Sequence, residues 1–131
     1  MTAIRVLLVD DAADFLHSAC AFLERLPGVQ LVGMAMSGTE AVELALRLAP
    51  DLVLMDMMMP GMSGLAATTL IKMRPKPPRV VIVTLHDNPE YRLAAESALA
   101  DGYVCKSDFT TAVPAITGAL FAGSGVTGRV E

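Results

Sequence analysis

The stretch DLVLMDMMMPGMSG, residues 51–64, places a short apolar run before Asp56 and a Pro-Gly loop after it. Three other short apolar runs also end on polar side chains: IRVLLV on Asp10-Asp11, VVIV on Thr84 and GYVC on Lys106. In a parallel α/β sheet, the carboxyl ends of the strands converge on one crevice, where such folds bind ligands. The sequence therefore predicts that carboxylates, a hydroxyl and an ammonium gather at one edge of a sheet.

Between these runs the chain alternates the patterns of strands and helices. The apolar runs predict strands over residues 4–9, 29–36, 51–55, 79–84 and 102–105. Apolar residues at helical spacing predict helices over residues 14–26, 38–49, 63–73, 89–100 and 108–122. Five such repeats with short connections predict one α/β domain, built on a doubly wound, five-stranded parallel sheet.

Local signals indicate where several helices begin. Ser37 followed by Glu40 is a capping box, and Asn88-Pro89 predicts the start of the fourth helix. Pro114 suits a first turn better than a helix interior, so the last helix is expected to start later than Asp108. Residues 123–131, GSGVTGRVE, are expected to be a flexible tail or the start of a linker, which leaves residues 1–122 as the domain.

Composition excludes several classes of function. The chain has 131 residues, 53% of them apolar, and a net charge of −4. Its few basic residues form no cluster of the kind that binds nucleic acid. No apolar run approaches the roughly 20 residues that span a membrane, and no signal peptide is apparent. Cys20 and Cys105 have no metal-ligand spacing, so reduced thiols in a cytoplasmic protein are expected.

The sequence resembles the receiver domain of two-component response regulators over about residues 4–122. The matching segments are VDD (9–11), DLVLMDMMMPGMSG (51–64), VVIVTLHD (80–87) and GYVCKSDF (102–109). GYVCKSDF and the segment TLHDNPEYR (84–92) are most similar to receivers that precede a LuxR-type helix-turn-helix. The resemblance implies a flavodoxin-like (βα)5 fold with strand order 2-1-3-4-5, which sets Asp10, Asp11 and Asp56 side by side.

The three carboxylates predict a metal site. Two carboxylates about 5 Å apart repel by about 3 kcal/mol at an effective dielectric of about 20. A divalent cation relieves this repulsion, and hard oxygen ligands favour Mg²⁺ or Mn²⁺. By resemblance, Asp11 and Asp56 bind the metal directly, Met58 adds its backbone carbonyl, and Asp10 acts mainly through water.

The resemblance also assigns the phosphoryl chemistry. Asp56 would accept a phosphoryl group as an acyl phosphate. Thr84 would donate its hydroxyl to a phosphoryl oxygen, and Lys106 would supply a positive charge. Tyr103 would be a switch whose ring turns inward as Thr84 moves.

These assignments imply a cytoplasmic signalling switch rather than an enzyme with turnover. A sensor histidine kinase would phosphorylate the chain, and the face of helix 4, strand 5 and helix 5 would repack. The output would be transcription through a DNA-binding domain absent from this chain, which itself binds neither nucleic acid nor membrane. A homodimer is left open.

The sequence departs from the family pattern at several positions. Leu85 is bulkier than the usual residue after the switch threonine, and neither Met58 nor His86 obviously positions a hydrolytic water. Slow self-dephosphorylation is therefore expected. Ser107 follows Lys106 where many receivers have a cis proline, and the sequence does not decide the isomer of this peptide bond.

Three other functions remain to be weighed. A phosphohydrolase of the haloacid dehalogenase type would need an acid at the position of Met58. A flavodoxin-like or Rossmann-like cofactor module would need a phosphate cradle after the first strand, where DDAADF is acidic. A receiver-like interaction module that is never phosphorylated would keep the fold without the chemistry.

Overall fold

A parallel sheet forms the centre of the computed structural model, which describes residues 2–122 and 126–127. The main strands lie in the order β2-β1-β3-β4-β5. Their bounds are Thr2–Val9 (β1), Val29–Ala35 (β2), Leu52–Asp56 (β3), Arg79–Thr84 (β4) and Gly102–Cys105 (β5). All four neighbouring pairs are parallel. The predicted doubly wound, flavodoxin-like fold is confirmed.

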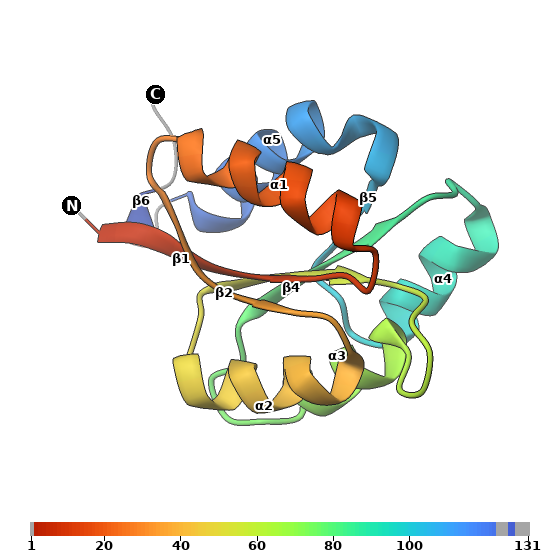
Figure 1. The fold of residues 1–131 in the computed structure, drawn as a ribbon. Helices are drawn as coiled ribbons and strands as arrows, with labels where there is room; N and C mark the ends of the chain where they lie inside the picture. Colours follow the sequence, from red (N-terminus) through yellow and green to blue (C-terminus); the bar gives the residue numbers. More distant parts are fainter. Residues whose placement is uncertain (1, 123–125, 128–131) are drawn as a thin grey trace.

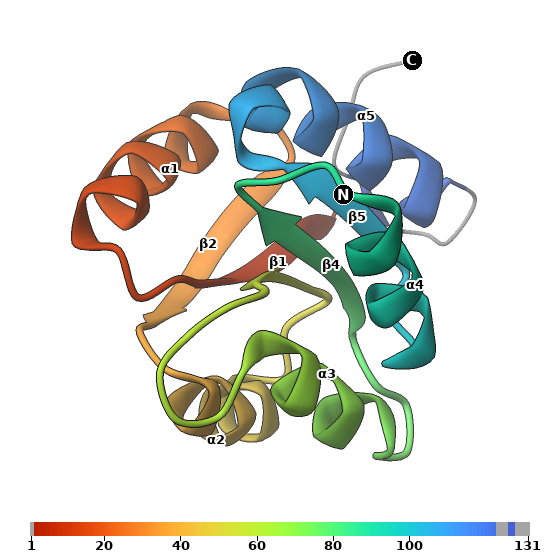
Figure 2. The ribbon, with the colours of Figure 1, turned by 90° about the vertical axis from the view of Figure 1, so that its right-hand side faces the viewer.

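Five α-helices cover the two faces of this sheet. They are α1 (Ala13–Arg25), α2 (Gly38–Leu48), α3 (Gly64–Lys72), α4 (Pro89–Ser97) and α5 (Phe109–Phe121). Helices α1 and α5 lie on one face, and α2 and α3 lie on the other (Figure 1). Helix α4 packs beside β4 and β5 (Figure 2), and its Ala95 belongs to the same core as α2 and α3.

Alternation along the strands divides the core into two halves. In β1, Ile4, Val6 and Leu8 pack toward α1 and α5, whereas Leu7 and Val9 pack toward α2 and α3. All five side chains are at most 1% exposed. Since successive side chains of a strand point to opposite faces, a strand covered on both sides must be apolar throughout. This explains why the strand sequences are continuous apolar runs.

The predicted helix caps are present in the structure. The Ser37 hydroxyl accepts the N–H of Glu40 at 3.1 Å, and the Glu40 carboxylate accepts the N–H of Met36 at 2.9 Å. The Asn88 side chain accepts the N–H of Glu90 at 2.8 Å, and Pro89 occupies the first turn of α4. These bonds satisfy amide groups that have no partner inside the helix.

The start of the last helix differs from the prediction. Helix α5 begins at Phe109, directly after the short 3₁₀ turn of Lys106–Asp108, and Pro114 lies inside it. Asp108 occupies the N-cap position but its side chain makes no capping hydrogen bond. The expectation of a later start was wrong because α5 buries Phe109, Val113 and Phe121 in the core, and that packing outweighs the cost of an interior proline.

A sixth strand was not predicted. Val126–Thr127 forms β6, which pairs in parallel with Thr2 and Ala3 at the start of β1. These two residues belong to the segment 123–131 that the sequence favours as a tail. The rest of that segment lies outside the described residues.

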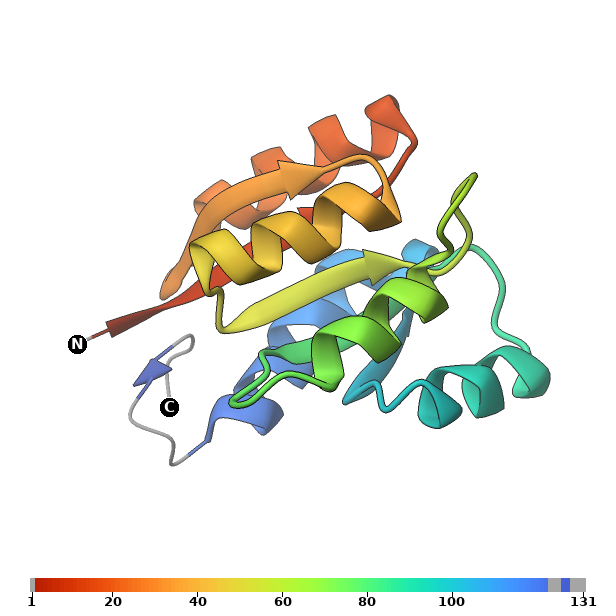
Figure 3. The same cartoon turned by 90° about the horizontal axis from the view of Figure 1, so that it is seen from below.

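Viewed from below, α2 and α3 lie side by side across their face of the sheet (Figure 3).

Candidate functional site

The carboxyl ends of β1 and β3 bring three aspartates together. Val9 of β1 is paired with Met55 of β3, so Asp10 and Asp56 follow at the same edge of the sheet. Asp10 is fully buried and Asp56 is 6% exposed. One carboxylate oxygen from each of Asp10, Asp11 and Asp56 can be chosen so that all lie within 4.8 Å of one another. The predicted convergence of these residues is therefore observed.

Lys106 supplies a positive charge to this cluster. Its Nζ lies 2.7 Å from Oδ2 of Asp10 and 3.6 Å from Oδ1 of Asp56. The same ammonium lies 4.5 Å from the centre of the Phe15 ring, a cation–π contact that orients the lysine. Phe15 lies on α1, and the sequence did not predict its contact with the lysine. Within the described residues no peptide bond is cis, so the bond between Lys106 and Ser107 is trans.

The Asp10 carboxylate is only partly satisfied by the protein. Its Oδ1 accepts the N–H of Ala12 at 2.8 Å. Its Oδ2 is buried, and its one polar contact among the described residues is the ion pair with Lys106 at 2.7 Å. Three ionised carboxylates and one ammonium would leave two negative charges unbalanced. The donor set and its charge fit a hard divalent cation, which prefers oxygen ligands.

The electrostatics of the cluster act most strongly on Asp56. Burial raises the pKa of its carboxyl from 3.8 to about 7, and the Asp10 carboxylate acts in the same direction. The Lys106 ammonium opposes this rise, while Asp11 adds to it. Without a cation, the cluster therefore limits its own repulsion by favouring a proton on Asp56.

A cavity of about 350 Å³ opens beside these carboxylates. It is lined by Asp11, Ala12, Asp56, Met58, Thr84, Leu85, His86, Tyr91 and Lys106. Met58 is 64% exposed and Leu85 is 68% exposed, so both lie at the cavity surface. The sequence did not predict Tyr91 here, because its place depends on how α4 packs. The cavity gives a small ligand access to Asp56.

The loop after β3 approaches the Asp56 backbone closely. Gly64 begins α3 and donates its N–H to the carbonyl of Met57 at 2.9 Å. A Cβ at position 64 would overlap the carbonyl oxygen of Asp56. The Ser63 hydroxyl accepts the N–H of Ala66 at 3.1 Å and so caps α3. Position 64 therefore needs glycine for the loop to close over the site.

Thr84 lies between Asp56 and Lys106 in the sheet. It ends β4, where its neighbour Val83 is paired with Asp56, and Thr84 itself is paired with Cys105. Its side chain is buried, and its hydroxyl accepts the N–H of His86 at 3.5 Å. The predicted hydroxyl is thus at the correct strand end, bound to the loop before α4.

Tyr103 contacts that same loop. Its hydroxyl donates to the carbonyl of His86 at 2.7 Å. The Arg92 guanidinium lies 4.6 Å from the centre of the Tyr103 ring and also bonds Asp87 at 3.0 Å. The sequence suggested Tyr103 but not Arg92, since an exposed arginine on a helix carries no distinguishing pattern. Tyr103 therefore connects β5 to the end of β4 through the loop.

Comparison with known proteins identifies the class to which this fold and site belong. The family model of the response regulator receiver domain matches residues 6–115. The chain belongs to this family. LiaR of Bacillus subtilis, a transcriptional regulatory protein, is 38% identical over 99 residues, which cover 74% of this chain and 47% of LiaR. NarL of Escherichia coli K12, a nitrate/nitrite response regulator, is 33% identical over 77% of this chain and 47% of its own length.

Solved structures agree with this assignment. A LuxR-family response regulator from Aurantimonas is 38% identical with a TM-score of 0.84, and the match covers 94% of this chain and 87% of that one. The NarL receiver domain of Mycobacterium tuberculosis is 29% identical with a TM-score of 0.84, and covers 95% of this chain and 99% of its own. Receiver domains of response regulators are signalling modules.

The matched relatives are longer than this chain. It spans 47% of LiaR and only 28% of a protein-glutamate methylesterase of Methanospirillum hungatei, with which it is 42% identical over 99 residues. Most of that enzyme therefore lies outside the matched region.

Among the described residues, no helix is long and apolar enough to cross a membrane.

Proposed function

We propose that the chain is a phosphorylation-dependent switch in which residues 1–122 form the receiver and Asp56 accepts a phosphoryl group from a sensor histidine kinase. The observation that carries this proposal is the cluster of Asp10, Asp11 and Asp56 beside Lys106. One oxygen from each carboxylate lies within 4.8 Å of the others, and Lys106 Nζ lies 2.7 Å from Oδ2 of Asp10. The chain is then a regulator with a single self-modifying step. It is not an enzyme that turns over a released substrate.

Asp56 has the chemistry of the acceptor. A carboxylate oxygen of Asp56 forms a bond to phosphorus, and the bond from phosphorus to the donor nitrogen or oxygen breaks, with its electron pair leaving on the donor. Lys106, 3.6 Å from Asp56, would then face the new phosphoryl oxygens. The Thr84 hydroxyl would donate to one of them. Transfer depends mainly on positioning and charge, which these side chains supply.

Mg²⁺, or Mn²⁺ in its place, fits the donor set of this site. Asp11, Asp56 and the backbone carbonyl of Met58 would hold it directly, and Asp10 would act mainly through water. When bound, the cation neutralises charge on the carboxylates and on the transferring group. The excess negative charge of three carboxylates beside a single ammonium supports this assignment.

Phosphorylation would be transmitted through the end of β4. The new group carries about two negative charges. It would draw Thr84 and Lys106 toward it, which alters the loop that Tyr103 holds by its bond to His86. The face of α4, β5 and α5 would repack in favour of a partner-competent state. The output would be transcription, through a DNA-binding domain outside this chain.

The test uses acetyl phosphate as a small phosphoryl donor, with Mg²⁺ in excess. We expect the intact mass of the wild-type chain to rise by one phosphoryl group. Asp56→Asn, which preserves size and removes the acceptor charge, should gain none. Unchanged mass in the wild type, while another receiver domain is phosphorylated under the same conditions, would favour an interaction module that is never phosphorylated.

A further inference from the structure

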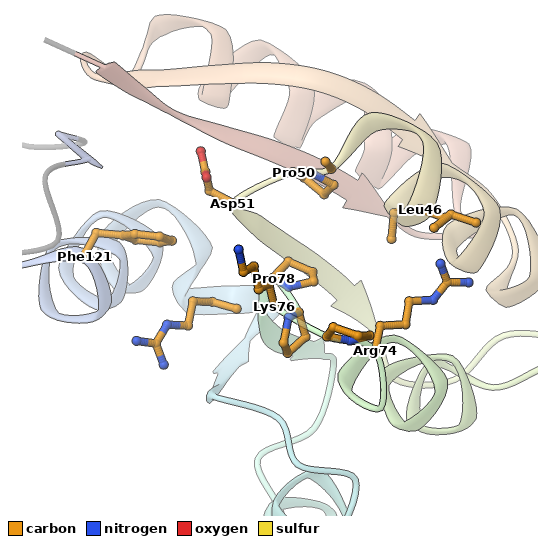
Figure 4. A pocket seen from close by; sticks show the side chains of 12 residues that line it. Leu46, Pro50, Asp51, Arg74, Lys76, Pro78 and Phe121 are labelled. Carbon is orange, nitrogen blue, oxygen red and sulfur yellow. The ribbon is translucent and has the colours of Figure 1, made fainter.

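A second cavity lies at the opposite end of the sheet from the aspartates. It has a volume of about 600 Å³ and is formed by the end of α2, the starts of β3 and β4, the proline-rich connector after α3, and Phe121 of α5 (Figure 4). Cavities of roughly 300–1,000 Å³ commonly hold small molecules. The proposed phosphorylation chemistry uses none of these residues.

The cavity has cationic groups without partners. Arg74 is half-buried, yet its guanidinium makes no hydrogen bond or ion pair with any described residue. Lys76, in the same lining, also has no such partner in the described part of the chain. A partly desolvated guanidinium is most stable when a carboxylate or phosphate accepts its hydrogen bonds. Arg74 therefore favours an anionic ligand, and the exposed Lys76 adds a second positive charge to the same lining.

The other charged groups of the lining are already engaged. Arg79 pairs with Asp101 at 3.4 Å. The Asp51 carboxylate accepts the N–H of Arg5 at 2.8 Å, which fixes it at the start of β3. Among the described residues that line the cavity, Asp51 is the one carboxylate against three cationic side chains, so this lining has an excess of positive charge. This contrasts with the cavity beside Asp56, whose lining contains two carboxylates and one ammonium.

The rest of the lining is apolar. Leu46 is 64% exposed beside the cavity. The other apolar contributors are Ala45, Ala49, Pro50, Pro75, Pro77, Pro78 and Phe121. Figure 4 shows Arg74 and Leu46 together on one side of this cavity and Phe121 on the other. A ligand that spans the cavity would therefore meet both cationic and apolar side chains.

The backbone of the cavity lining is restricted at several positions. Ala49 and Lys76 have positive φ values of 47° and 51°, a conformation that non-glycine residues rarely adopt. Prolines at positions 75, 77 and 78 further restrict the connector. A rigid lining lowers the conformational entropy that binding must remove.

From these observations, we propose that this cavity is a binding site for a small organic anion with an apolar or aromatic body. A carboxylate or phosphate of the ligand would accept hydrogen bonds from Arg74 and Lys76, and the apolar body would pack on Leu46, Pro78 and Phe121. The site is independent of phosphorylation at Asp56.

The test uses anilinonaphthalene sulfonate, a dye with an aromatic body and one anionic group whose fluorescence rises in apolar surroundings. Wild type should bind it saturably, with amide chemical shifts by NMR changing at Ala49 and Phe121. Arg74→Gln and Lys76→Gln should each weaken binding by about tenfold, the effect of one charge-assisted hydrogen bond. Arg25→Gln, an exposed position on α1 that loses the same charge, should change binding less than twofold.

Competition then identifies the anionic group. Naphthoate and naphthyl phosphate should displace the dye, and the tighter of the two indicates a carboxylate or a phosphate ligand. Neutral naphthalenemethanol should displace it far less. The proposal is overturned if binding does not saturate, if Arg74→Gln and Arg25→Gln bind equally, or if the shifts centre on the cavity beside Asp56. None of these readouts depends on phosphorylation, so failure here leaves the switch proposal untouched.

Discussion

Tyr103 holds the loop between β4 and α4 by a single hydrogen bond from its hydroxyl to His86. Tyr103→Phe removes this bond and keeps the ring, so we expect a loss of about 1 kcal/mol in the free energy of unfolding. We also expect faster amide hydrogen exchange in residues 85–88. Tyr91→Phe is the matched control, because the Tyr91 hydroxyl bonds no described residue. Equal exchange in the two variants would show that the hydroxyl does not restrain the loop.

Met58 lines the cavity through which water would reach an acyl phosphate on Asp56. It is 64% exposed in the lining of the cavity, and a thioether is only a weak hydrogen-bond acceptor. We expect wild type to lose its phosphoryl group slowly, over minutes or longer. Met58→Asn, whose amide can orient a water molecule, should lose it several-fold faster, and Met58→Leu should resemble wild type. Intact mass followed after removal of acetyl phosphate measures the decay; loss within seconds in wild type would contradict the account.

At the scale of elements, the turn from β3 into α3 depends on Gly64. A Cβ there would overlap the Asp56 carbonyl, whereas a Cβ at Gly61 would meet nothing within 4 Å and only the positive φ of 76° opposes it. Gly64→Ala should therefore cost on the order of 3 kcal/mol in the free energy of unfolding, against about 1 kcal/mol for Gly61→Ala. Urea unfolding measures both. If Gly64→Ala lowered the free energy of unfolding less than Gly61→Ala does, the loop would have to move freely away from Asp56.

The elements themselves were largely predictable because their signals are local. Apolar runs defined the five main strands, and Ser37 and Asn88 marked helix starts by side-chain capping. Pro114 misled because the packing of α5 is a tertiary effect that no local pattern records. Strand β6 was missed for a related reason, since two residues pair with the distant start of β1.

The same distinction applies to the site. Strand ends predicted Asp10, Asp56 and Thr84 together, because the sheet topology alone sets them at one edge. Contacts from helix faces were not predictable: Phe15 reaches Lys106 from α1, and Arg92 reaches Tyr103 from α4. Both contacts depend on how a packed helix is rotated about its axis. Apolar periodicity predicts which face of the helix is buried, but it does not define the rotation closely enough to predict a single contact.

At the scale of the whole molecule, the charge of Asp56 links stability to pH. Its pKa is about 7 in the folded chain, against 3.8 ordinarily, so between these values the folded state binds more protons than the unfolded state. Stability from the neutral carboxyl is fully present below about pH 3.8 and is lost as the pH rises through about 7. Without metal, the free energy of unfolding of Asp56→Asn should therefore increase relative to that of wild type as the pH rises, by about 4 kcal/mol at most.

Urea unfolding of both proteins at pH 5, 6, 7 and 8, with chelator present, measures this difference. Carboxylates distant from Asp56 contribute alike to the two proteins and cancel, whereas Asp10 and Asp11 interact with Asp56 and belong to the measured difference. Excess Mg²⁺ should stabilise wild type most above pH 7, where protons no longer compete for Asp56. A pH-independent difference between the two proteins would mean that Asp56 is ionised throughout.

The central claim is that the three carboxylates hold a divalent cation that Asp56 needs in order to accept phosphorus. The most direct measurement is the initial rate of phosphoryl uptake from acetyl phosphate, by intact mass, with Mg²⁺ or with chelator. We predict a fall of at least about 100-fold with chelator, recovery with Mg²⁺ or Mn²⁺, and a higher Mg²⁺ requirement in Asp11→Asn. Equal rates with and without metal, or an unchanged requirement in Asp11→Asn, would contradict it.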